Sequence, residues 1–218
     1  AMKWYQTSAT GAGSADLGWI SLGHATDAEI AAQLELTFAD LFDAVDPLVD
    51  DLTGAELGCP VGYLPVNSGD PLLECLTLRP GMEIAASRLE TRRYAAYVGA
   101  TTELRKEEGI AHDPLTNTLY IAMSAVERGM EDFAKSGLPD VTHDLGGPND
   151  IRLPFNECGA VYALDLAYNE VIGSDYVAEN MNSFVAGTPT TYPVGSAYEG
   201  NRCSVSGLAN PDNLTFID

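Results

Sequence analysis

Beyond Gly99, apolar residues come in short runs that alternate with polar turns, a pattern typical of β-strands. The clearest turn contains Asp113-Pro114, with Asn117 three residues later, and it lies between two extended apolar runs. Long loops at 137–154 and 187–202 break the pattern, and loops of this length are usually functional or cover a face. We expect strands over residues 108–111, 119–124, 159–166, 183–186 and 214–217.

Residues 1–25 predict a strand or hairpin arm with a turn at 10–15, and residues 26–98 carry a helical pattern. Thr26 and Glu29 form a capping box, which predicts a helix start. A second helix is expected from Thr37 until Asp46-Pro47 stops it, and a third over 80–98. Since strands do not alternate with helices and no glycine-rich phosphate loop is found, a parallel nucleotide-binding sheet is disfavoured. The sequence predicts an incomplete all-β array with a helical insertion over 26–98.

The composition narrows the range of partners. The chain has 218 residues and a formal net charge of −21, so its surface repels nucleic acid and anionic lipid and suits divalent cations. No apolar run approaches the roughly 20 residues of a membrane span, so we expect no membrane insertion. The first residues already form an amphipathic segment and not a signal peptide, so we expect the chain to begin in mid-protein or after processing.

The pattern of the four cysteines bears on whether the protein resides in an oxidising or a reducing compartment. Cys59 and Cys75 bracket a loop rich in Pro, Gly and Asn, and closing it would stabilise the fold by about 3 kcal/mol in the chain-entropy model. The cysteines lack zinc-site spacing, which leaves disulfides or buried thiols of a cytosolic protein. We favour disulfides, and with them a periplasmic or extracellular location.

Charged residues stand at two places where apolar runs begin. Lys106, Glu107 and Glu108 precede the first predicted strand of the hairpin, and Asp212 precedes the last predicted strand. The simpler interpretation is a solvated acidic edge that discourages sheet pairing, and for Asp212 ordinary turn chemistry. The alternative is that both strand mouths face a shared centre, as in radial β architectures. A third acidic group, Glu127, Glu131 and Asp132, is explained either by a calcium-binding loop or, more simply, by surface acid.

Several long segments resemble the PhoX-type alkaline phosphatases: WISLGHATDAEIAAQ, LETRRYAAYVGATTELRKEEGIAHDPLTNTLYIAMS, GGPNDIRLPFNECGAVYALDL and NPDNLTFI. The resemblance implies a β-propeller with a helical insertion, whose centre holds iron and calcium ions and hydrolyses phosphomonoesters outside the cytoplasm. It assigns Glu108 to metal binding and Asp212 to calcium. Lys106 stands where better-known members have a phosphate-contacting arginine, and lysine lacks the planar fork of that side chain.

The resemblance also implies that residues 1–218 are a single partial propeller domain. Further metal ligands of the family lie upstream and downstream of this sequence, so we expect the fragment alone not to complete the metal cluster. The remainder of the same propeller, or a homo-oligomer, is then the expected partner, because open sheet edges favour association.

The expected function is metal-dependent hydrolysis of a small phosphoester substrate, with Ca²⁺ and Fe³⁺ as cofactors and Lys106 as the catalytic cation. Two alternatives remain open: a non-catalytic secreted calcium-binding propeller, and an esterase-like or lactonase-like hydrolase on the same scaffold.

Overall fold

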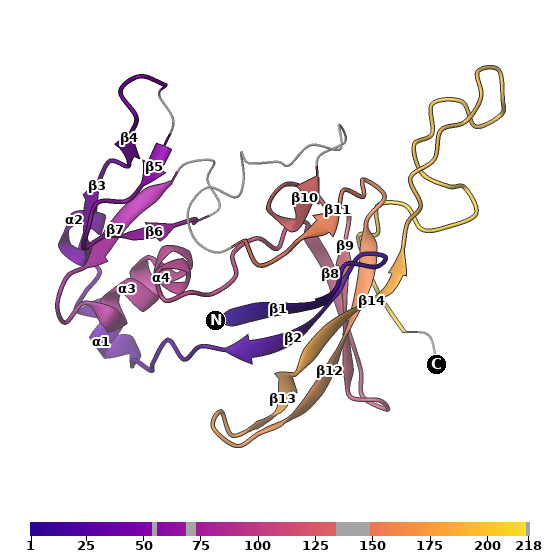
Figure 1. Ribbon diagram of the computed structural model, residues 1–218. Coiled ribbons are helices and arrows are strands. Elements are labelled where there is room, and N and C mark those ends of the chain that lie inside the picture. The colour runs from indigo at the N-terminus through magenta and orange to yellow at the C-terminus, as the bar shows by residue number, and fades with distance from the viewer. Residues whose placement is uncertain (54–55, 69–72, 134–148, 217–218) are drawn as a thin grey trace. The chain divides into compact units, whose positions relative to one another are not determined.

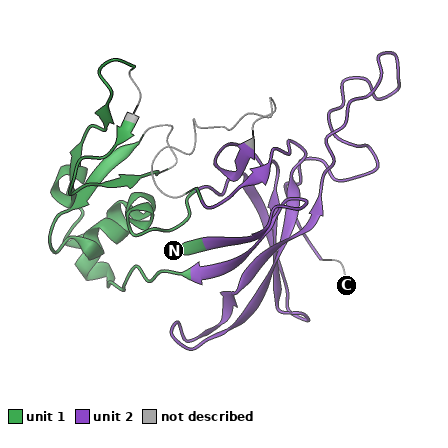
Figure 2. Cartoon of the chain, viewed as in Figure 1, with its two compact units in different colours: residues 1–3, 19–102, 141–149 green, residues 4–18, 103–140, 150–218 purple. Residues whose placement is uncertain are grey.

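A computed structural model of the chain describes residues 1–53, 56–68, 73–133 and 149–216 (Figure 1). The chain divides into two compact units, coloured separately in Figure 2. Unit 1 comprises residues 1–3, 19–102 and 141–149, and unit 2 comprises 4–18, 103–140 and 150–218. Most of the regular structure is antiparallel strand, which confirms a mainly β chain. The described residues form no closed barrel or propeller, so the propeller stays a prediction.

A seven-stranded sheet dominates unit 2. Its order is β1-β2-β14-β12-β9-β8, and β13 pairs with β12 beyond the reach of β14. The strands are β1 (Met2–Ser8), β2 (Ser14–Trp19), β8 (Glu107–Asp113), β9 (Thr118–Met123), β12 (Ala160–Asn169), β13 (Ser174–Ala178) and β14 (Asn180–Ala186). The 3₁₀ helix η1 (Arg128–Met130) leads into β10 (Glu131–Phe133), which pairs in parallel with β11 (Leu153–Pro154).

The predicted hairpin is confirmed as β8 and β9. Asp113 closes its turn by accepting hydrogen bonds from the Leu115 amide (2.9 Å) and the Thr116 hydroxyl (2.8 Å). The two hydrogen bonds lower the pKa of the Asp113 carboxyl, because both stabilise its ionised form, and the bond from the Leu115 amide has the larger effect. Asn117 follows in the left-handed region with φ 53°. Local turn chemistry therefore sets the register of this edge of the sheet.

The strands of unit 2 enclose a dense core around Tyr162, whose burial raises the pKa of its hydroxyl. That hydroxyl donates a hydrogen bond to the Ala12 carbonyl, which satisfies it inside the core. The other large, fully buried residues of the unit are Trp4, Met123, Val126, Met130, Ile151, Leu153 and Met181. One predicted strand is missing: residues 214–216 form no strand, and residue 217 lies outside the described residues.

Unit 1 is mixed rather than mostly helical, which corrects the prediction for residues 26–98. The predicted capping box does begin the first helix, where Glu29 accepts from the Thr26 amide at 2.7 Å. The helices are α1 (Asp27–Ala31), α2 (Phe38–Leu41), α3 (Glu83–Leu89) and α4 (Thr91–Tyr97). Between them lie the sheet β3-β7-β6 and the hairpin β4-β5, made of β3 (Phe42–Val45), β4 (Leu48–Val49), β5 (Glu56–Gly58), β6 (Leu64–Val66) and β7 (Glu74–Leu78).

Two predicted helices of unit 1 do not run their full length. Phe42 pairs with Leu78, so the second predicted helix gives way to strand after Leu41. The predicted helix over 80–98 is broken at Glu90, whose backbone leaves the helical region at φ −129° and ψ 48°. The core of the unit consists of Leu41, Phe42, Val66, Leu76, Ala85, Ala86 and Ala96.

The predicted disulfides are present. Cys59 bonds to Cys75 in unit 1, and Cys158 bonds to Cys203 in unit 2. In the part of the chain that the structure describes, no helix has the length and apolar character needed to cross a membrane. Most of the predicted loop at 137–154 lies outside the described residues.

Arg93 connects α4 to β7, and we expect it to contribute strongly to the stability of unit 1. Its Nε lies 3.0 Å from both carboxylate oxygens of Glu74, it also pairs with Glu90, and its guanidinium lies 4.9 Å from the ring centroid of Phe38. The hydrogen bond to Glu74 raises the pKa of Arg93, and its side chain is only 22% exposed.

Arg93→Met should therefore lower the free energy of unfolding of unit 1 by about 1–3 kcal/mol, because it leaves two half-buried carboxylates without their cation. The matched control is Arg79→Met, since the Arg79–Asp43 pair is nearly half exposed and should contribute less than about 1 kcal/mol. Denaturant titration of both variants measures the difference, and equal losses would contradict a special role for Arg93.

Candidate functional site

Lys106 and Glu108 lie together at the start of β8 in unit 2. The Lys106 Nζ is 3.8 Å from Glu108 Oε1, and the two side chains are 44% and 35% exposed. Lys106 adopts φ 61°, and the β8–β9 register shifts between Glu107 and Gly109. A left-handed residue beside such a bulge redirects the chain locally, a device common next to functional sites. The structure thus brings together the predicted catalytic cation and one predicted metal ligand.

Ser124, the residue after β9, holds both of them. Its amide donates to the Lys106 carbonyl at 3.1 Å, and its hydroxyl donates to Glu108 Oε1 at 3.1 Å. The ammonium of Lys106 and the hydroxyl of Ser124 therefore reach the same carboxylate oxygen.

Asp212 reaches the same end of β8 through its main chain. A Cβ added at Gly109 would lie 2.2 Å from the Asp212 carbonyl oxygen and 3.0 Å from the Asn213 Cα. Segment 211–214 thus crosses directly over the residue that follows Glu108, a hundred positions away in sequence. The main chain of Asp212 therefore lies against β8 beside Glu108, and convergence of the exposed side chains of Glu108 and Asp212 on a shared cation stays a prediction.

Asn210 anchors this segment and was not predicted. Its side-chain amide donates to the carbonyls of Ser124 and Glu157, both at 2.9 Å, and its backbone amide donates to Cys158 at 2.8 Å. Its backbone is left-handed at φ 46°. An asparagine before Pro211 was the available signal, because asparagine tolerates this conformation better than other side chains.

The predicted Ca²⁺ and Fe³⁺ would need a cluster of donor side chains. Within residues 1–53, 56–68, 73–133 and 149–216, no three His, Cys, Asp or Glu side chains group closely enough to hold a metal ion. Calcium takes about 6–8 oxygen ligands, so Glu108 and Asp212 alone do not make such a site. The described residues therefore do not fit a complete calcium or iron cluster.

The acidic group of Glu127, Glu131 and Asp132, which the sequence suggested as a calcium-binding loop or surface acid, includes a paired and a buried carboxylate. Glu127 pairs with Arg105 at 3.0 Å, and Glu131 is buried at the start of β10. Surface acid is therefore the wrong explanation for Glu131. Glu103 is buried too, and its Oε2 accepts the amides of Asp150 (2.9 Å) and Ile151 (3.0 Å).

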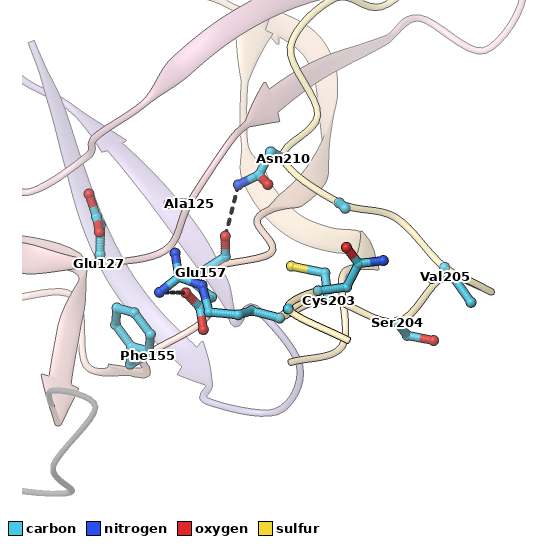
Figure 3. Close-up of a pocket in the computed structure, with 13 residues that line it drawn as sticks. Ala125, Glu127, Phe155, Glu157, Cys203, Ser204, Val205 and Asn210 are labelled. Atoms are coloured by element: carbon cyan, nitrogen blue, oxygen red, sulfur yellow. Dashed lines mark hydrogen bonds and ion pairs between the residues drawn. The ribbon is translucent and has the colours of Figure 1, made fainter. Parts of the chain in front are cut away.

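A cavity of about 580 Å³ opens beside Asn210, within unit 2 (Figure 3). Arg202 lines it, and its guanidinium lies 3.0 Å from Glu157 Oε2. The volume falls within the range of about 300–1,000 Å³ that small-molecule sites occupy. Its walls are Ala125, Glu127, Phe155, Glu157, Gly200, Asn201, Arg202, Cys203, Ser204, Val205, Gly207, Ala209 and Asn210.

Sequence reasoning missed this cavity, although it singled out the loop at 187–202 as one that is functional or covers a face. The disulfide partner Cys203 lies in the cavity wall, and Cys158 fastens that wall to the start of β12. The bond between these two cysteines, 45 positions apart, ties the loop to the sheet together with the hydrogen bonds of Asn210. Compared with known proteins, the chain matches no family model, no curated protein and no solved structure.

Proposed function

We propose that the chain supplies part of the active site of a PhoX-like phosphomonoester hydrolase. The observation that carries the proposal is the meeting of Lys106, Glu108 and the main chain of Asp212 at one end of β8. These are the three residues that the resemblance to PhoX-type phosphatases singles out. Segments a hundred residues apart would not need to meet there if each were only a solvated strand end.

Lys106 would bind the phosphoryl group. A phosphate dianion approaching a chain of net charge −21 needs a local cation, and the Lys106 ammonium is held at a partly exposed position by Glu108. In the transition state, negative charge spreads over the phosphoryl oxygens, and a positioned cation lowers its energy. Lysine acts there as a point charge, so it would attract the phosphoryl group without orienting it through bidentate hydrogen bonds.

The metal ions stay part of the proposal through Glu108 and Asp212, with further donors needed beyond the described residues. The two disulfides are compatible with a secreted protein and support a periplasmic or extracellular location.

The test is hydrolysis of a chromogenic phosphomonoester by the full-length natural polypeptide, with Ca²⁺ and Fe³⁺ supplied and then chelated. Lys106→Met and Glu108→Gln should each lower kcat/KM by about a hundredfold or more, the usual loss when one electrostatic group is removed. The matched control is Glu107→Gln, which removes the same charge one residue away and should stay within about twofold of the wild type.

Each alternative has its own outcome. Calcium binding without turnover would support the non-catalytic binding protein, and turnover of a carboxyl ester alone would support the esterase-like or lactonase-like enzyme. Phosphatase activity that survives both Lys106→Met and Glu108→Gln would overturn the assignment of the site.

A further inference from the structure

The cavity and the Lys106–Glu108 pair are joined by a short chain of hydrogen bonds. Asn210 lies in the cavity wall and donates to the Ser124 carbonyl, and the Ser124 hydroxyl donates to Glu108. Ala125, the next residue along, already lines the cavity. Ser124 therefore bonds to Glu108 through its hydroxyl and to the cavity-lining Asn210 through its carbonyl.

Arg202 is the only basic residue among the thirteen that line the cavity. Its side chain is 70% exposed, whereas its partner Glu157 is 20% exposed. The other acidic residue in the wall, Glu127, is paired with Arg105, which is 29% exposed and outside the lining. Both carboxylates of the cavity are thus compensated, and most of the Arg202 side chain still faces solvent.

A guanidinium carries five N–H donors in a planar fork that matches an oxyanion. The ion pair joins one nitrogen of Arg202, Nη1, to one oxygen of Glu157. Glu157 therefore holds the guanidinium at the cavity while other donors remain for a ligand. In a chain of net charge −21, such a cation is the feature that lets a second negative group enter.

We propose that the cavity binds the alcohol portion of the substrate and that Arg202 selects alcohols that carry a second oxyanion. The preferred substrates are then phosphomonoesters with a carboxylate or a further phosphate on the leaving group. This inference rests on the proposed phosphatase function for the placement of the phosphoryl group, but the oxyanion site itself does not depend on turnover.

The test measures binding by calorimetry with two phosphonates that cannot be hydrolysed, 4-(phosphonomethyl)benzoate and benzylphosphonate. They differ only in the carboxylate. The full-length wild type should bind the carboxylated compound about 10–100-fold more tightly, the usual effect of a hydrogen bond to a charged group. Arg202→Gln should abolish that preference and leave the Kd for benzylphosphonate within about twofold.

Arg152→Gln is the matched control, because it removes the same charge from an exposed position of unit 2 outside the cavity. The inference is overturned if the wild type shows no preference, if Arg202→Gln keeps it, or if Arg152→Gln loses it equally. A bisphosphonate in place of the carboxylated compound distinguishes a phosphate from a carboxylate as the preferred group.

These outcomes separate the inference from the function on which it rests. Arg202-dependent binding in a protein that hydrolyses no phosphomonoester would refute the phosphatase and leave the oxyanion site standing. Hydrolysis of phosphomonoesters with no Arg202-dependent preference for the carboxylated compound would refute the oxyanion site and leave the phosphatase standing.

Discussion

Gly109→Ala is expected to lower the free energy of unfolding of unit 2 by about 1–3 kcal/mol, the usual cost of overpacking a tight contact. The added methyl would lie 2.2 Å from the Asp212 carbonyl oxygen and 3.1 Å from the Leu214 nitrogen. These neighbours are backbone atoms, so no side chain can rotate away to make room. Either β8 or segment 211–214 has to move.

The contact between Gly109 and segment 211–214 also tests the candidate site, because it brings the main chain of Asp212 next to Glu108. Denaturant unfolding measures the stability loss, and amide hydrogen exchange should show faster exchange in residues 212–216. Gly109 is not among the residues with positive φ, so alanine suits its backbone and the effect is steric.

Gly207→Ala is the control for this prediction. It has the same chemistry and no positive φ, and its nearest neighbour, the Ser204 carbonyl oxygen, is 3.9 Å away. It should change stability by less than about 0.5 kcal/mol, as surface substitutions usually do. A Gly109→Ala protein as stable as the Gly207→Ala protein would mean that segment 211–214 does not lie against β8.

Removal of the Cys158–Cys203 disulfide should be the most damaging change in unit 2. The chain-entropy model predicts a loss of about 4 kcal/mol for the separation of 45 residues, against about 3 kcal/mol for the 16 residues between Cys59 and Cys75. Residues 187–216 contain no helix or strand, only an isolated bridge between Pro189 and Cys203. The covalent bond is therefore a main attachment of this segment.

The double variant Cys158→Ser/Cys203→Ser should consequently release the cavity wall together with Asn210 and Asp212. Thermal unfolding measures the stability, and hydrogen exchange locates the release, which should be confined to residues 187–216 and the start of β12. The double variant Cys59→Ser/Cys75→Ser is the control, because its bond lies in unit 1 and should leave exchange in 187–216 unchanged. Equal exchange in that segment for both proteins would contradict the prediction.

Where contacts are local, sequence reasoning was accurate. The capping box of Thr26 and Glu29, the turn closed by Asp113 and the β8–β9 hairpin involve residues a few positions apart. Side-chain chemistry and apolar alternation are sufficient for such elements, since their partners are adjacent in the chain. The presence of disulfides also followed from the cysteine pattern.

Errors arose where partners are distant. Residues 42–45 continue a helical pattern, yet they pair with β7, thirty or more residues later. Residues 214–216 have a strand pattern, but they do not join the sheet. They pack beside side chains of β8, β9, β12 and β14. There the rings of Phe216 and Tyr120 meet edge to face, with their centroids 5.4 Å apart. In both cases tertiary contacts overrode local preference.

The sequence by itself established a strongly acidic chain, favoured a mainly β fold and disulfides, and singled out Lys106, Glu108 and Asp212. Only the tertiary structure decided that segment 211–214 lies on Gly109, that Asn210 and Ser124 connect it to Glu108, and that Arg202 lines a cavity beside them. The physical reason is range: charge, turns and caps act over a few residues. A cavity and a shared strand end require backbone pairing and cross-links between segments that no local pattern places together.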